Sequence, residues 1–401
     1  MTLRKRLQDK IPRRILFGII IGILLAIAVL VIYTLFIGNP GPAKCGLPPM
    51  DIEVMKLDEN GNIQWKTHID SGGDDPASAI VQTPDGGYAV LALYSGSDSE
   101  GPNFFSRIVR LNRTGSIAGE RRYTRSEWRF NSLFTNPDGG YFAGAWYPGR
   151  ILVLDSSGEV TKTIRFGDAT SPSIFVPRSE RGFVVSLESS SGQNTRIMSL
   201  DADGNILWLH NDTPLVALRE SSLLATSDGG CIAGGYTPEV RELSFIRFDK
   251  TGTGLWNVTL GKSWDNRLIA MAEPRPGAYE IIYESARETG SSPAIVMETY
   301  SVTFDNNGTV LRQWMPDISP PVVRISEQDY LAVRLPEKGY GSSDAAGKPH
   351  TIVRLTDGGV FEWQTPVPAG WSDVIRIVPT DDGGCVVLGS SIQKEKNFFC
   401  L

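Results

Sequence analysis

Tryptophans with charged neighbours carry the candidate chemistry of this sequence. Three of them occupy matching places far apart in the chain. An indole ring offers a flat apolar face, and nearby carboxylates accept hydrogen bonds from hydroxyl groups, so this combination suits a sugar or another polyol. The alternative is that the three rings only cover the ends of strands. The candidate binding residues are Trp128, Arg129, Trp264, Asp265, Arg267, Trp371 and Asp373.

Familiar catalytic and metal-binding patterns are missing from the sequence. It contains no GxSxG, HExxH or P-loop pattern, and hence no nucleophile elbow, zincin site or phosphate cradle. The four cysteines and three histidines stand far apart, whereas zinc and iron–sulfur sites draw on closely spaced ligands. Asp58–Asn62 and Asp201–Asn205 begin like calcium loops but lack the further carboxylates, so Asx turns are expected there. We expect no catalytic residue, no metal and no cofactor.

Two short patterns alternate along the chain and define the elements that would position these residues. The first is an apolar residue, Asp or Asn, two variable residues and Gly, followed by an apolar stretch that often ends in Trp, as in Leu57–Trp65 and Leu200–Trp208. The second is a polar turn that runs into an apolar strand, as in Pro84–Val90 and Ser227–Gly235. Each pattern occurs seven times, in strict alternation, with a period of about 42 to 56 residues.

Each pattern has the composition of a β-hairpin. Asp or Asn accepts hydrogen bonds from the backbone two residues on, and Gly adopts the positive φ that completes the turn. Two hairpins per repeat imply four strands, and four-stranded units with a period of about 45 residues are typical of propellers. The sequence therefore predicts an all-β fold, a seven-bladed β-propeller over residues 51–401, with a solenoid as the main alternative. The three candidate tryptophans would each precede an innermost strand, around one mouth of the central channel.

Other recurrent residues are expected to pack inside the propeller. Five tryptophans share the end of the first pattern, and recurrence at one structural position favours packing between blades over ligand stacking. They are Trp65, Trp208, Trp256, Trp314 and Trp363. Two cysteines hold equivalent strand positions three blades apart and are expected to be buried and unpaired. These are Cys231 and Cys385.

The two ends of the chain are expected to share the last blade. Asn397–Leu401 matches the third strand of a repeat, and the strand that should follow it lies at Asn62–His68, near the N-terminus. Joining the two would leave no open sheet edge between the first and last blades. It would also bring Cys400 near Cys45, and we predict a disulfide between these two cysteines. The alternative is that all four thiols are free.

An uncharged stretch near the N-terminus predicts a membrane anchor. Residues 15–37 contain no charged side chain and are rich in Ile and Leu, and a transmembrane helix of that length spans a hydrocarbon core of about 30 Å. Residues 1–14 hold six Lys or Arg, so the positive-inside rule places this tail in the cytoplasm and the rest of the chain outside. Residues 38–50 form a linker rich in Pro and Gly. A cleaved signal peptide is the alternative.

Charge and sequons narrow the choice of partners. The whole chain has a net charge of −6, and residues 1–14 contribute +5, which leaves −11 for the remainder. An acidic ectodomain repels phosphate backbones, so no nucleic acid is expected as a partner. The expected partners are the lipid bilayer for residues 15–37 and a protein or glycan for the propeller. Four sequons are candidate glycosylation sites in an extracytoplasmic chain: Asn112, Asn211, Asn257 and Asn307.

The repeats resemble those of a known group of propellers. The Asp-x-x-Gly-x-x-x-Trp pattern resembles the docking motif of PQQ-like (quinoprotein-like) β-propellers, and the Asp-Gly-Gly-Tyr form is similar to repeats of archaeal and bacterial surface propellers. The resemblance covers about residues 51–401. Quinoprotein dehydrogenases are expected to carry adjacent cysteines over the cofactor, and this chain has no Cys-Cys pair. The resemblance thus implies a non-catalytic binding or scaffold module; an enzyme that acts on a polysaccharide at the channel mouth is the alternative.

Overall fold

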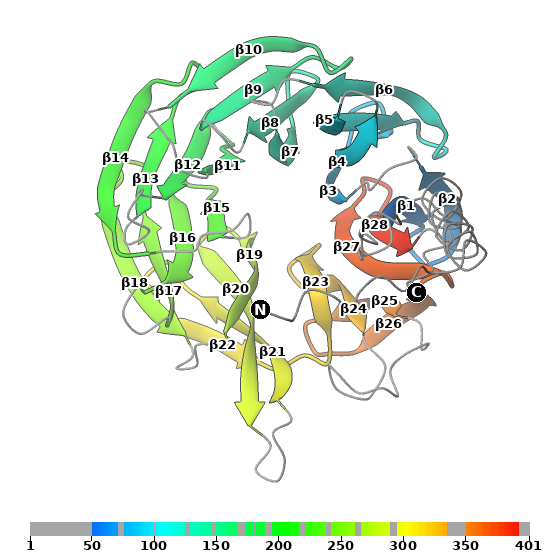
Figure 1. The fold of residues 1–401 in the computed structure, drawn as a ribbon. Coiled ribbons are helices and arrows are strands. Elements are labelled where there is room, and N and C mark those ends of the chain that lie inside the picture. Colours follow the sequence, from blue (N-terminus) through cyan, green and yellow to red (C-terminus); the bar gives the residue numbers. More distant parts are fainter. Residues whose placement is uncertain are drawn as a thin grey trace, which may run out of the picture. The chain divides into compact units, whose positions relative to one another are not determined.

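The described part of the chain is a ring of four-stranded antiparallel sheets (Figure 1). The computed structural model describes residues 50–392 except for 71–75, 99–100, 125–128, 146–148, 167–172, 180, 189–194, 216–221, 238–241, 261–265, 289–294 and 335–349. Within these ranges, 28 strands form seven sheets of four strands each. The prediction of an all-β, seven-bladed propeller is confirmed.

Six blades are built from strands that follow one another in the chain, from the innermost to the outermost. Blade I contains β3 (Ala77–Gln82), β4 (Tyr88–Asp98), β5 (Gly101–Leu111) and β6 (Ile117–Tyr123). Blade II contains β7 (Phe130–Thr135), β8 (Tyr141–Ala145), β9 (Arg150–Leu154) and β10 (Val160–Arg165). Blade III contains β11 (Ser173–Pro177), β12 (Phe183–Glu188), β13 (Thr195–Leu200) and β14 (Ile206–Thr213).

The next three blades repeat this order. Blade IV contains β15 (Leu223–Ala225), β16 (Cys231–Tyr236), β17 (Leu243–Phe248) and β18 (Gly254–Leu260). Blade V contains β19 (Arg267–Arg275), β20 (Ala278–Glu288), β21 (Ile295–Phe304) and β22 (Val310–Trp314). Blade VI contains β23 (Ser319–Arg324), β24 (Asp329–Arg334), β25 (Thr351–Thr356) and β26 (Phe361–Pro366). Buried side chains gather in seven apolar clusters, one at each seam between neighbouring blades.

The seventh, closing blade combines strands from distant parts of the sequence. Its order is β2 (Ile63–Ile69), β1 (Met50–Leu57), β28 (Cys385–Ile392) and β27 (Trp371–Pro379). The expectation that N-terminal and C-terminal strands share this blade is confirmed. The expectation for its third strand was wrong, because β1 fills that place and pairs directly with β28. Residues 397–401, which were assigned to the third strand, lie outside the described residues, as do Cys45 and Cys400.

Each outermost strand is joined to the next blade by a side chain that packs on a glycine. The ring of Trp65 in β2 covers Gly115 of blade I so closely that a Cβ there would lie 2.4 Å from the ring. Trp65 Nε1 donates to the carbonyl of Arg113 at 3.1 Å, and Thr67 Oγ1 donates to that of Gly115 at 2.6 Å. We call this contact an interlock. The seven interlocks are Trp65–Gly115, Tyr123–Gly158, Ile164–Gly204, Trp208–Gly252, Trp256–Gly308, Trp314–Gly359 and Trp363–Gly61.

The interlocks confirm that the five recurrent tryptophans pack between blades. All seven glycines have a positive φ, so the same residue satisfies the turn and leaves room for the neighbouring blade. The turn before each glycine is an Asx turn where Asp starts it. Asp58 Oδ1, for example, accepts hydrogen bonds from the backbone N–H of Asn60 at 2.9 Å and of Asn62 at 2.8 Å. The interpretation of this segment as an Asx turn is confirmed.

Hydrogen bonds of this kind lower the pKa of many turn carboxyl groups. Side-chain and backbone donors stabilise the ionised form of Asp58. Donors of the same kind act in the equivalent turns that begin at Asp155, Asp201 and Asp249. In the Asp-Gly-Gly turns burial opposes the effect but does not cancel it. Asp382, for example, accepts from Thr380 and from Lys56 Nζ. The pKa is lowered at Asp58, Asp85, Asp155, Asp201, Asp228, Asp249 and Asp382.

These turns make the propeller sensitive to acid. A carboxyl group whose pKa is lower in the folded state contributes stability above its unfolded pKa of about 3.9, and this contribution is lost as the pH falls through the folded value. The urea concentration at the midpoint of unfolding should therefore fall steadily between pH 5 and pH 3. The variant Asp201→Asn keeps the turn acceptor without the charge, so its midpoint should fall less steeply. A midpoint that stays constant down to pH 3 would contradict the argument.

One seam holds a buried charged network. Glu280 of β20 is fully buried and accepts hydrogen bonds from Ser301 Oγ and Tyr330 Oη. Arg324 Nη1 of β23 lies 2.9 Å from Glu280 Oε2, and its side chain is also buried. Arg324 lies 3.2 Å from Asp357 as well. Blades V and VI are thus joined by a pair of opposite charges whose hydrogen bonds replace the water that they lose.

The structure describes the two cysteines that were predicted to be buried, but not the predicted membrane anchor. Cys231 and Cys385 are buried and free, as expected, and burial raises the pKa of each thiol to about 12. The predicted anchor at residues 15–37 lies outside the described residues. In the part of the chain that the structure describes, no helix has the length and apolar character needed to cross a membrane.

Candidate functional site

The candidate residues that the structure describes lie at one edge of the propeller. Each inner strand begins where the outer strand of the preceding blade has ended, and we call this side the loop edge. Of the predicted residues, Trp128, Trp264 and Asp265 lie outside the described residues. Arg129 directly precedes β7, Arg267 begins β19, and Trp371 begins β27, so these three stand at the loop edge of three different blades. Arg129 and Arg267 are exposed, as is Asp373.

Trp371 is half-buried and packs on the neighbouring strand β28. The ring lies over Gly389 of β28, where a Cβ would come within 2.4 Å of it. It also packs on the apolar cluster that includes Val374 and Val387. The ring therefore covers part of β28 and remains partly open to solvent. Asp373 accepts a hydrogen bond from the backbone N–H of Val374 at 2.8 Å.

Arg267 faces a buried carboxyl group. Its Nη1 lies 4.0 Å from Glu284 Oε2 of the neighbouring strand β20, and the two residues are paired in the sheet. Burial raises the pKa of Glu284, although the charge of Arg267 opposes the shift. A carboxyl group with a raised pKa is typical of general acids. Sequence reasoning did not single out Glu284, because nothing in its local sequence marks it as buried.

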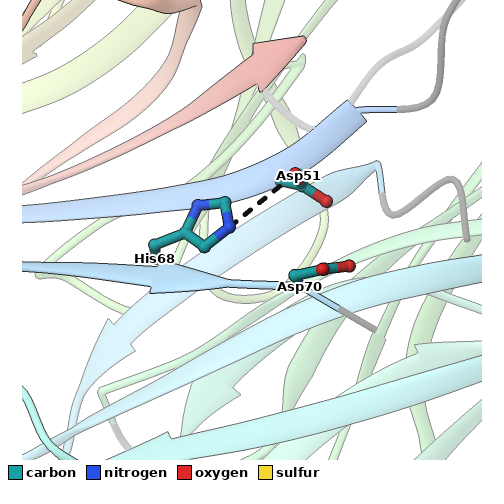
Figure 2. A group of neighbouring side chains, drawn as sticks. All are labelled: Asp51, His68 and Asp70. Carbon is teal, nitrogen blue, oxygen red and sulfur yellow. Dashed lines mark ion pairs between the residues drawn. The ribbon is translucent and has the colours of Figure 1, made fainter. Parts of the chain in front are cut away.

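A second group of polar side chains lies at the loop edge of the closing blade (Figure 2). Asp51 is near the start of β1, His68 is near the end of β2, and Asp70 follows that strand. Figure 2 shows the imidazole of His68 facing Asp51, and one ligand atom from each of the three residues lies within 4.8 Å of the others. Asp51 is buried, whereas His68 and Asp70 are exposed. The antiparallel pairing of β1 with β2 brings them together.

Glu53 orients the imidazole of this group. His68 Nδ1 lies 2.9 Å from Glu53 Oε1, and Ser391 Oγ donates to the same oxygen at 2.7 Å. His68 Nε2 lies 3.7 Å from Asp51 Oδ2. Partial burial disfavours the charged imidazole, but the hydrogen bond that the ring donates to Glu53 and the charges of the three carboxylates outweigh it, so the pKa of His68 is raised. Sequence reasoning missed this group because it searched for histidines and cysteines that are close in sequence.

Asp51, His68 and Asp70, which we call the acidic group, lie on the same surface as Trp371. Trp371 pairs with Ser391, and Ser391 pairs with Asp51 on its other side, so the three stand in one row across the closing blade. Paired residues point to the same face, and adjacent strands lie about 4.8 Å apart, which puts the backbones of Trp371 and Asp51 about 10 Å apart. We call this surface the closing-blade site. It consists of Asp51, Glu53, His68, Asp70 and Trp371.

Comparisons with known proteins find only distant similarity to solved structures. No family model matches the chain, and no curated protein matches it in sequence. Among solved structures it is similar to a streptogramin B lyase, with 13% identity over 85% of this chain and 98% of that one and a TM-score of 0.45. Virginiamycin B lyase from Staphylococcus aureus shares 12% identity over 78% and 98% of the two chains, with a TM-score of 0.44.

The propeller domain of the trilobed protease from Pyrococcus furiosus is also similar, with 11% identity over 78% of this chain and 77% of that one and a TM-score of 0.37. At such identities and scores the likeness carries no argument about the activity of this chain, and its fold rests on its own seven sheets. The function must therefore be argued from the site.

Proposed function

We propose that this protein is a non-catalytic binding module that holds a glycan at the loop edge of its propeller. The observation that carries the proposal is the closing-blade site, where Trp371 stands in the same row of the sheet as Asp51, with Ser391 between them. Sugars present apolar C–H faces and hydroxyl groups, which pair with an aromatic face and with carboxylate acceptors respectively. Because Trp371 is fixed by its packing on Gly389, little side-chain freedom is lost on binding.

The test is binding of the full-length chain to a glycan array, followed by titration of the best ligand. Trp371→Leu keeps an apolar group over Gly389 but removes the aromatic face, so it should weaken binding about 5- to 150-fold, by analogy with 1–3 kcal/mol per stacked ring. Trp371→Phe retains a ring and should lose much less. If the folded Leu variant binds as well as the parent, the closing-blade site is not the contact. If no glycan binds, a protein partner is the remaining choice.

A second function, an enzyme that acts on a polysaccharide, is favoured by one observation. Glu284 is a buried carboxyl group with a raised pKa, and it lies beside Arg267 at the loop edge. Glycoside hydrolysis generally needs two carboxyl groups, one of which is protonated at working pH. Glu284 would be the acid of such a pair. Release of reducing sugar by the parent, lost in Glu284→Gln, would favour the enzyme over the binding module.

We further propose that residues 15–37 anchor the propeller to the membrane, with the N-terminus inside and the propeller outside. The exposure of all four sequon asparagines supports glycosylation in that location, since Asn112 and Asn307 stand in turns and Asn211 and Asn257 stand on outermost strands. The interlocks support kinship with PQQ-like propellers, because they use the Asp-x-x-Gly-x-x-x-Trp residues in a docking role.

A further inference from the structure

We propose that the closing-blade site binds one divalent transition-metal ion, of the class of Zn²⁺, through Asp51, His68 and Asp70. The acidic group would bind the ion whether or not the propeller also binds a glycan. The proposal rests on three features of the structure: the orientation of the imidazole, the separation of the ligand atoms and the mixed donor set.

The first feature is the orientation of His68. Nδ1 is held against Glu53 Oε1 at 2.9 Å, and a carboxylate accepts hydrogen bonds, so the proton of the neutral ring belongs on Nδ1. The lone pair of Nε2 then points toward the group that contains Asp51 and Asp70. A lone pair that faces carboxylates is unfavourable, so either a proton on Nε2 or a metal ion between the groups would relieve it. Metal-binding histidines are generally held in this way, by a carboxylate on the second ring nitrogen.

The second feature is distance. Nε2 and Asp51 Oδ2 lie 3.7 Å apart, which is too long for a hydrogen bond. Two ligand atoms at that separation, each about 2.1 Å from a common ion, subtend an angle of about 120° at it. The widest separation among the three ligand atoms is 4.8 Å or less. The two most distant atoms would therefore approach each other by about 1 Å to share one ion. His68 and Asp70 are exposed, which permits this movement.

The third feature is the donor set. One imidazole and two carboxylates favour Zn²⁺ and its neighbours over Ca²⁺ and Mg²⁺, which prefer oxygen donors. Three protein ligands leave at least one coordination position, and the exposure of His68 opens it to solvent. Asp51 comes from β1 and His68 from β2, and Glu53 is held by Ser391 of β28. A bound ion would therefore strengthen the attachment of the outermost strand of the closing blade.

The test uses the purified full-length chain, stripped with a chelator and titrated with zinc chloride in a calorimeter. One ion should bind per chain, and the Tm should rise with excess Zn²⁺. His68→Gln and Asp70→Asn should each weaken binding at least 10-fold. Glu53→Gln should weaken it about 10- to 100-fold, as is usual when the residue that orients a ligand is changed. The matched control is His350→Gln, which changes a histidine outside the group and should leave binding unchanged.

Circular dichroism of each variant shows whether it is folded, and Asp70→Asn, at an exposed position after β2, provides the safeguard if His68→Gln is not. The proposal would be overturned if Zn²⁺ bound His68→Gln as tightly as the parent. It would also be overturned if His350→Gln lost as much Zn²⁺ affinity as His68→Gln. Absence of saturable binding in the parent would show that a proton alone occupies the site between His68 and Asp51. Tighter binding of Ca²⁺ than of Zn²⁺ would likewise exclude a site built on the imidazole.

Discussion

Replacement of Gly115 by alanine is expected to lower the free energy of unfolding by about 2–5 kcal/mol. Two costs add. A residue with a Cβ at the positive φ of 82° costs about 1–2 kcal/mol, and forcing a methyl group into a closely packed place costs about 1–3 kcal/mol. The second cost arises because the new Cβ would lie 2.4 Å from the ring of Trp65 and 3.0 Å from Thr67 Oγ1. Urea denaturation followed by tryptophan fluorescence measures the loss.

Gly86 provides the matched control for this substitution. Its φ is 78°, but the nearest atoms to an added Cβ are 3.9 Å away and belong to the flexible side chain of Arg113. Gly86→Ala should therefore cost only the backbone strain, about 1–2 kcal/mol. Equal losses in the two variants would show that the interlock leaves more room than its geometry indicates. A larger loss for Gly115→Ala would show that the interlock itself is rigid.

Replacement of Glu280 by alanine is expected to cost about 3–5 kcal/mol, because it leaves the buried guanidinium of Arg324 without its closest carboxylate. The hydroxyl groups of Ser301 and Tyr330 also lose their acceptor. Asp357 compensates only in part, at 3.2 Å from Arg324. The free energy of unfolding, measured in urea, reports the loss.

The surface pair Arg121–Glu159 supplies the control for the buried pair. Glu159 is 58% exposed, so Glu159→Ala should change stability by less than about 1 kcal/mol. A double variant, Glu280→Leu with Arg324→Met, removes both charges and should be closer to the parent than Glu280→Ala is, because no unpaired charge then remains in the seam. If Glu280→Ala proves as mild as Glu159→Ala, water must reach the network.

Local turn chemistry explains why the blades could be predicted from the sequence. Each Asp and Gly pair fixes a hairpin without help from distant residues, and the recurrence of the turns sets the number of blades. The third strand of the closing blade was misassigned because a resemblance between Asn397–Leu401 and other strands was preferred to a local argument. Because the Asx turn at Asp58–Asn62 needs a strand on each side, the local argument would have indicated a strand at Met50–Leu57, directly before the turn.

The acidic group was harder to predict because a bulge decides its register. Leu57 pairs with Ile63, and counting outward from that pair would set Glu53 opposite Thr67. The structure instead shifts the register between Lys56 and Leu57, so that Glu53 pairs with His68. Without this shift the imidazole would lie on the other face of the sheet, away from Glu53 and Asp51. Bulges are seldom visible in sequence, so the group emerges only with the coordinates.

The shared closing blade also sets an order of events when the chain is made. β1 pairs with β28 through Leu57 and Cys385, which are 328 residues apart. At about 5–20 residues per second, the ribosome takes on the order of 15 to 65 s to supply the partner strand. During that time the hairpin of β1 and β2 presents an unpaired edge of the kind that recruits other chains. Of the strands in the propeller, β1 is thus made first and paired last, once β28 has emerged.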